Sequence, residues 1–208
     1  LFVSKGSALF KTPECSKAAE IIADVLGIKV TGETTAAISY IAPNEEGKDL
    51  LADHTADYPM VVHSSQMLIE VKENTQVLAT TVLTYTDPAD HTKFASAISN
   101  PPGVPIDNPA IVVNNYGKGK TMYIAGVIDN AKYEPQRLAF IRMMDYISPK
   151  PYDLQTDAPK VVQITAAYHD SLKRIVVNLI NSPDVLPAVP VNNITVKVKP
   201  AFSGEVTV

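Results

Sequence analysis

The stretch Pro109-Ala-Ile-Val-Val-Asn-Asn-Tyr-Gly-Lys-Gly-Lys-Thr-Met-Tyr-Ile-Ala-Gly126 has the pattern of a β-hairpin. Two apolar runs, 110–113 and 122–125, flank a polar stretch that contains glycines. Gly117 and Gly119 would supply the positive φ angles that a hairpin loop of this length needs. Nothing in the stretch is typical of a catalytic group, so it indicates a fold and assigns no reaction.

Two helices are predicted around this hairpin. Thr12 is the expected N-cap and Pro13 the first residue of a helix whose apolar residues recur at helical spacing until Gly27 ends it. A second helix is predicted from Glu134 to Ile147, and the proline-rich residues 148–151 break it. We therefore place a domain boundary at residue 148.

Short runs rich in Val, Ile, Leu and Thr predict strands on both sides of the second helix. Before that helix, the expected strands are 1–4, 28–31, 37–42, 60–63, 67–71 and 76–84. Residues 86–108 are rich in Pro and are expected to form a long irregular connection with a short helix at 94–98. After the boundary, a hairpin is expected at 161–168 and 174–180, with further strands at 193–199 and 204–208. This all-β tail of about 60 residues is small for an independent core.

Composition excludes several classes of protein. The net charge of −4 disfavours nucleic acid as a partner, and no apolar run approaches the roughly 18 residues that span a bilayer, so no membrane partner is expected. Cys15 is the only cysteine, which excludes an intrachain disulfide and a multi-cysteine metal site. The sequence names no compartment. Because the chain opens on Leu1-Phe2-Val3, a strand already in progress, we expect a natural N-terminal part to be missing.

No catalytic, metal or cofactor site stands out. A nucleophile elbow needs glycines on both sides of the nucleophile, and neither Gly6-Ser7-Ala8 nor the surroundings of Cys15 fit that pattern. The glycine-lysine turn 117–120 leads into a strand rather than a helix, so it is not a phosphate-binding loop. Carboxylates are plentiful, but the sequence singles out no pair for glycoside hydrolysis. The histidines lack zinc-ligand spacing; they are His54, His63, His91 and His169.

A few residues are weak candidates for contact with a sugar. His63 follows a predicted strand and precedes two serines, which favours a polar site at a strand end. Tyr116, Tyr123 and Tyr133 lie in or near the predicted hairpin, and their rings could stack on sugar rings. The chain has no Trp, which makes a dedicated sugar-binding module a poorer candidate. Asn193-Ile194-Thr195 matches the N-glycosylation pattern, a short motif that predicts little by itself.

Several segments, in order, resemble the C-terminal half of beta-galactosidases and related glycoside hydrolases. The 109–126 hairpin is similar to the hairpin of their amidotransferase-like domain, which is called the trimerisation domain. Leu1–Gly6 and Ala23–Ile28 resemble a strand and the end of a helix in that domain. Val162–Asn181 resembles a strand of the small β-domain that closes these enzymes, with Asn178 where the family often has His.

This resemblance implies an α/β fold. Residues 1–148 would be a flavodoxin-like (class I glutamine amidotransferase-like) domain, incomplete at its N-terminus, and residues 149–208 a small antiparallel β-sandwich. The family carries its catalytic carboxylates on a TIM barrel, which would lie before residue 1, so no catalytic residue transfers to this chain. The expected role is structural: packing on the barrel of the same protein and forming a homo-oligomer. The alternatives are a carbohydrate-binding module and a hydrolase built around His63 or Cys15.

Overall fold

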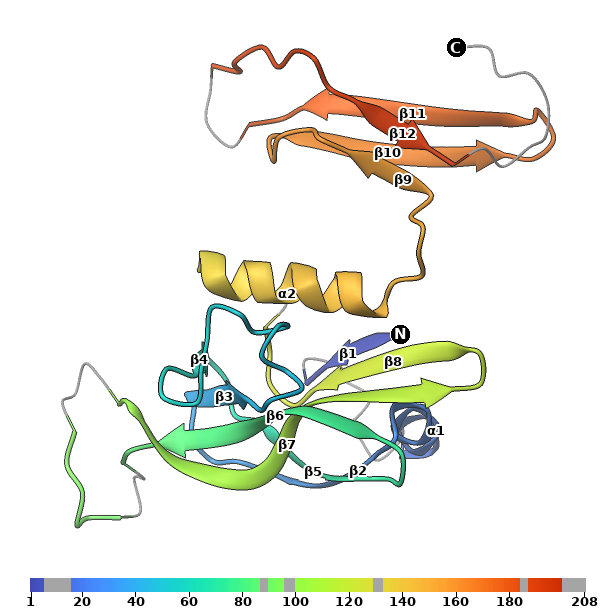
Figure 1. Ribbon diagram of the computed structural model, residues 1–208. Helices are drawn as coiled ribbons and strands as arrows, with labels where there is room; N and C mark the ends of the chain where they lie inside the picture. The colour runs from blue at the N-terminus through green and yellow to red at the C-terminus, as the bar shows by residue number, and fades with distance from the viewer. Residues whose placement is uncertain (6–15, 87–89, 96–99, 129–132, 184–186, 200–208) are drawn as a thin grey trace. The chain divides into compact units, whose positions relative to one another are not determined.

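The computed structural model (Figure 1) describes residues 1–5, 16–86, 90–95, 100–128, 133–183 and 187–199, without the side chains of 16–19. The chain divides into two compact units, Leu1–Ile147 and Ser148–Val208. In the described part of the chain, no helix is long and apolar enough to cross a membrane.

A curled six-stranded sheet forms the centre of the first unit (Figure 1). In spatial order its strands are β1 (Phe2–Ser4), β8 (Gly119–Ile124), β7 (Pro102–Tyr116), β6 (Gln76–Thr84), β3 (Ser39–Pro43) and β4 (Met60–Val62). Only β1 and β8 are parallel; each other neighbouring pair is antiparallel. Two further strands, β2 (Ile28–Glu33) and β5 (Met67–Val71), form a separate antiparallel pair.

This sheet does not confirm the expected flavodoxin-like fold. A doubly wound sheet needs parallel strands joined by helical crossovers, whereas β6, β7 and β8 follow one another as antiparallel neighbours. The described first unit is mostly β, with two helices. Sequence could not separate the two arrangements, because an apolar run of Val and Ile looks the same in a parallel strand and in any strand buried on both faces.

Both helices pack where the sequence predicted them. α1 (Ser16–Leu26) ends at Gly27, whose φ of +71° is the left-handed conformation of a helix stop, as predicted. The predicted cap Thr12 and Pro13 lie outside the described residues. α2 (Glu134–Ile147) has the predicted bounds and buries Ala139 and Met143.

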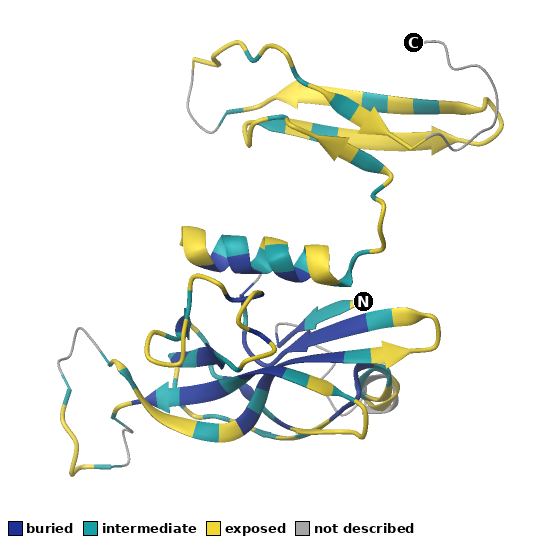
Figure 2. Ribbon diagram, in the orientation of Figure 1, coloured by how far each residue is buried: buried dark blue, intermediate teal, exposed yellow. Residues whose placement is uncertain are grey.

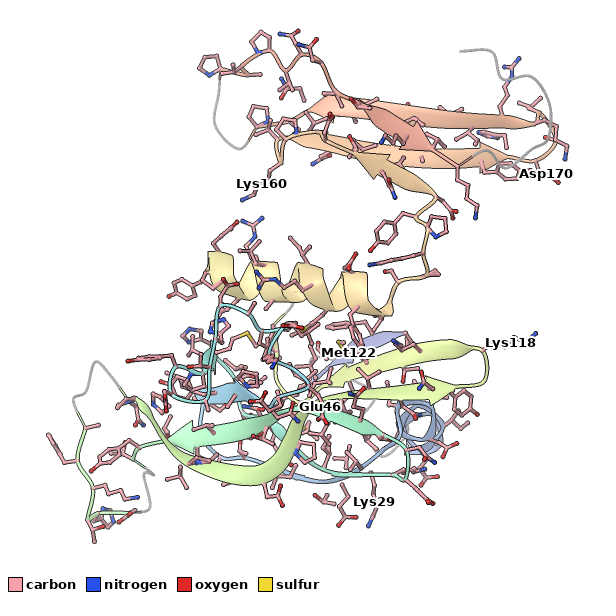
Figure 3. The ribbon with its side chains drawn as sticks, in the orientation of Figure 1. Lys29, Glu46, Lys118, Met122, Lys160 and Asp170 are labelled. Carbon is pink, nitrogen blue, oxygen red and sulfur yellow. The ribbon has the colours of Figure 1, made fainter. Side chains whose placement is uncertain are left out.

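The hairpin is tighter than predicted. Tyr116 pairs with Gly119, so only Gly117 and Lys118 form the turn, and Lys118 points away from the protein at the tip (Figure 3). Gly117 has the expected positive φ of +57°, but Gly119 is the first residue of β8 and does not, so that part of the prediction was wrong. The ladder extends through Asn114 and Asn115 because polar residues at an exposed strand end still pair through their backbones.

The predicted irregular connection at 86–108 was wrong for its last part, because β7 already begins at Pro102. Prolines are tolerated there since this half of β7 pairs only with β6, through several register shifts, and pairing with β8 starts at Ile111. Phe94 and Ala95 are not helical, and the remainder of the predicted 94–98 helix lies outside the described residues.

The core of the first unit lies on both faces of the sheet, as the blue centre of Figure 2 shows. Alternate residues of β8 point to opposite faces: Met122 and Ile124 join the cluster beneath α2, while Tyr123 joins the cluster with Leu26 of α1 and Ile28 of β2. The hairpin is therefore buried between two layers, which is why both of its strands read as apolar runs.

The second unit is thinly packed. It contains two antiparallel pairs, β10 (Val162–His169) with β11 (Arg174–Asn181), and β9 (Leu154–Thr156) with β12 (Val196–Val198). The predicted hairpin is confirmed by β10 and β11, the sequence missed β9, and the strand expected at 204–208 lies outside the described residues. None of the described residues of this unit is buried (Figure 2).

Candidate functional site

Polar side chains gather where the parallel strands β1 and β8 end. Lys5 follows β1 directly and is only 4% exposed. Its Nζ donates to the Ser65 carbonyl oxygen at 2.7 Å and also contacts Glu33 Oε1 and Ser65 Oγ. The Ser65 hydroxyl donates to the same Glu33 oxygen. We call Lys5, Glu33 and Ser65 the Lys5 clamp.

The clamp is closed. An ammonium group has three N–H donors, and those of Lys5 meet three acceptors, one on Glu33 and two on Ser65. No N–H is left to hold a ligand, and the ion pair joins the end of β1, the end of β2 and the segment that follows β4. The geometry therefore holds three chain segments together and does not present a nucleophile.

Tyr123, one of the sequence candidates for sugar contact, lies in the core beside this clamp. Its side chain is fully buried, and burial raises the pKa of the phenol, with the negative charge of Glu33 raising it further. A ring with no exposed face offers no surface for a sugar to stack on. The sequence placed Tyr123 in the hairpin correctly but could not tell which of two buried faces it joins.

A buried hydrogen-bond network lies next to the clamp, and sequence reasoning missed it. Gln66 Nε2 donates to Ser39 Oγ at 2.9 Å, and Thr81 Oγ1 donates to Gln66 Oε1 at 3.0 Å. Asn108 donates to Thr81 Oγ1 at 2.9 Å and accepts from the Ile69 backbone N–H at 2.9 Å. The network ties the β2–β5 pair to the main sheet. Its signal in the sequence is a polar residue inside an apolar run, such as Thr81 within β6.

The structure brings two other candidates together on the surface. The His63 and Tyr133 ring centroids are 6.2 Å apart, with their planes inclined by 35°. His63 is exposed and Tyr133 is 58% exposed. The neighbouring Ser64 Oγ accepts a hydrogen bond from the Val127 N–H at 3.2 Å, which places this pair near the end of β8. Tyr116 is exposed too, but it lies at the opposite end of the β7–β8 hairpin.

The remaining sequence candidates do not form a reactive group. Cys15 and Gly6-Ser7-Ala8 lie outside the described residues. His91 and His169 are exposed, and His54 lies in the connection between β3 and β4. Over the described ranges, no three His, Cys, Asp or Glu side chains are placed to hold a metal ion.

The second unit has a shallow hollow of about 300 Å³ between β9 and β12, lined by exposed polar side chains: Gln155, Thr156, Asp157, Thr195 and Lys197. Asp157 Oδ1 accepts the Thr195 backbone N–H at 2.6 Å, and these hydrogen bonds with Thr195 lower the pKa of the carboxyl. Asn193 of the glycosylation pattern lies two residues before Thr195; it is exposed and has a φ of +59°.

No protein-family model matches the sequence, and no curated protein matches it either. Solved structures do. Alpha-L-fucosidase isoenzyme 2 from Paenibacillus thiaminolyticus matches 83% of this chain with a TM-score of 0.59 and 16% identity, and the chain spans 27% of that enzyme's length. A beta-galactosidase from Rahnella sp. R3 (22% identity, 70% of this chain, 18% of that one, TM-score 0.40) is more loosely similar. So is a cytoplasmic protein of Salmonella typhimurium (11% identity, 72% of this chain, 54% of that one, TM-score 0.48). The chain thus shares a fold with one part of the fucosidase.

Proposed function

We propose that this chain is a non-catalytic structural and oligomerisation region of a glycoside-hydrolase-like protein, in which it supports a catalytic barrel. In this proposal residues 1–148 are an amidotransferase-like domain and residues 149–208 its small β-domain. The observation that carries the proposal is the fold shared with a fraction of the fucosidase chain. β1 pairs in parallel with β8, and α1 is the next element after β1 in the chain. This arrangement supports the amidotransferase-like part of the proposal.

The polar interior of the first unit supports a scaffold. The donors of the Lys5 clamp are met by acceptors of the clamp itself, and the Gln66–Asn108 network joins one strand pair to the sheet. Buried polar groups that satisfy one another fix the register of strands, which suits a region whose task is to hold shape.

The second unit supports the expectation of a partner surface. Apolar side chains remain exposed on its β10–β11 hairpin: Val176 at 41%, Leu179 at 44% and Ile180 at 53%. A unit with so little buried surface gains stability when another surface covers it. A second copy of the chain, or the rest of the parent protein, would supply that cover.

Light scattering on the chain over a wide range of concentrations tests the self-association part. We expect a mass above the 22.4 kDa of one chain that grows with concentration. The double variant Val176→Lys/Ile180→Lys, which charges one face of β11, should shift the mass toward the monomer, while Ser171→Lys in the β10–β11 turn should not. A clean monomer at high concentration contradicts self-association.

The His63–Tyr133 pair favours a second candidate function, contact with a carbohydrate. Two exposed rings 6.2 Å apart form a surface on which a sugar ring could stack. A glycan array tests this function. It is supported if the chain binds a glycan, if Tyr133→Ala abolishes the binding and if Tyr116→Ala leaves it intact. Binding that depends on Tyr116 instead would place the contact at the hairpin tip.

A further inference from the structure

The connection between β3 and β4, residues 44–59, covers part of the core on the α2 side of the sheet. Leu50 and Leu51 of this cover segment are buried in the same cluster as Ala139 and Met143 of α2. The segment contains turns and bends only. Besides this packing, an ion pair joins the segment to the helix, from Arg142 Nη1 to Asp53 Oδ2 at 2.5 Å. Most of its backbone hydrogen bonds stay within the segment; among the described residues, one backbone bond leaves it, from the Asn44 N–H to the Leu78 carbonyl at 3.1 Å. A segment whose backbone bonds are mainly its own can open as a unit.

His54 of the cover segment carries a buried ring nitrogen without a partner. No described residue forms a hydrogen bond with its Nε2. Protonation makes both ring nitrogens donors, and at Nε2 it places a charged N–H in a buried position where no described residue offers an acceptor.

Two charged groups act on this ring, Asp53 from the segment itself and Arg142 from α2. Burial is the largest influence and lowers the pKa of His54; Asp53 raises it and Arg142 lowers it. Because Asp53 and Arg142 are paired with each other, their fields largely oppose, and burial decides the direction.

We propose that the cover segment is pH-sensitive: it opens away from the core when protonation makes Nε2 of His54 a charged donor. Opening frees Nε2 to bond with water, and it separates the segment from α2 at the Asp53–Arg142 pair. This inference is independent of the proposed function.

The sign of the pH dependence follows from linkage. The closed state binds the proton less well than the open state, whose histidine titrates near its ordinary value of about 6.5. Closure is therefore fully stable above that pH and loses stability as the pH falls toward the closed-state pKa. Within that window, the ratio of open to closed molecules should rise roughly tenfold for each unit by which the pH falls.

Nuclear magnetic resonance on the whole chain tests this directly. The ring signals of His54 should titrate below the ordinary histidine value of about 6.5, and the amides of residues 44–59 should shift with the same midpoint. As the pH falls, the hydrogen-exchange protection factors of residues 44–59 should decrease, while those of the β7–β8 hairpin should stay unchanged. A His54 that titrates at or above about 6.5, or cover-segment amides that do not shift with its titration, overturns the proposal.

Two variants complete the experiment. His54→Phe keeps a ring but cannot take up a proton, so protection of residues 44–59 should become independent of pH. His169→Gln removes an exposed histidine of the β10–β11 hairpin and should leave the response unchanged. If His54→Phe lowers protection at every pH, the titration of the unmodified chain still decides. A response that persists undiminished in His54→Phe contradicts the proposal.

Discussion

The asymmetry of the Lys5 clamp is the clearest feature at the scale of single residues. The Lys5 side chain is 5% exposed, whereas that of its partner Glu33 is 42% exposed. A buried charge that loses its partner is costly, whereas a half-exposed one can turn to water. The two ends of this ion pair should therefore respond differently to mutation.

Glu33→Gln should destabilise the protein more than Lys5→Met. The first change leaves the Lys5 ammonium buried beside a neutral amide, at a cost of about 3 kcal/mol. The second leaves a carboxylate that solvent can reach, at a cost of about 1 kcal/mol. Urea unfolding of both variants measures the difference.

The control for this comparison is the surface pair of Lys29 and Glu70, whose side chains are 68% and 63% exposed. Lys29→Met should change the free energy of unfolding by less than about 1 kcal/mol. If Glu33→Gln and Lys5→Met lowered the free energy of unfolding equally, the ion pair between buried Lys5 and Glu33 would be contradicted.

At the scale of elements, the end of α1 depends on Gly27. A Cβ at this position would meet Thr75 Oγ1 at 2.2 Å and the Asn114 side chain at 2.8 Å, besides adopting a φ of +71°. Gly117 at the hairpin tip also has a positive φ, but a Cβ there would meet nothing within 4 Å. The two glycines separate backbone strain from steric conflict.

Gly27→Ala should therefore cost more than Gly117→Ala. Both variants pay the left-handed backbone penalty of about 1 kcal/mol. Only the first must also displace Thr75, whose hydroxyl donates to the Gly27 carbonyl at 2.9 Å. Thermal unfolding of the two variants gives the comparison, and equal melting temperatures would show that Thr75 moves aside freely.

Several helices and strands could be predicted from the sequence, because their positions follow from local sequence patterns. α2 has the predicted bounds, and the β10–β11 hairpin lies where turn residues separate two apolar runs. The start of β7 was missed because prolines normally argue against a strand, and only its one-sided pairing makes them acceptable. Strand order was also out of reach, since β1 pairs with β8 across most of the first unit.

The candidate site was less predictable than the fold. Lys5, Glu33 and Ser65 are far apart in the chain, and no pattern in the sequence links them. His63 was singled out because it follows a strand, but its neighbour Tyr133 comes from the segment before α2, and only the folded chain brings the rings together.

At the scale of the whole molecule, the two units differ in how much they bury. The first unit contains two buried clusters, whereas the second has no buried residue among those described. We expect residues 1–147 alone to unfold cooperatively, and residues 148–208 alone to give a poorly dispersed amide spectrum. A well-dispersed spectrum from the isolated second unit would show that it needs no covering surface.

In its proposed role, the chain supports chemistry that is carried out elsewhere. The most direct measurement is an assay of the full chain against fluorogenic galactoside, fucoside and ester substrates. We expect no turnover above buffer. Turnover that His63→Ala abolishes would contradict this role and make this chain a hydrolase in its own right.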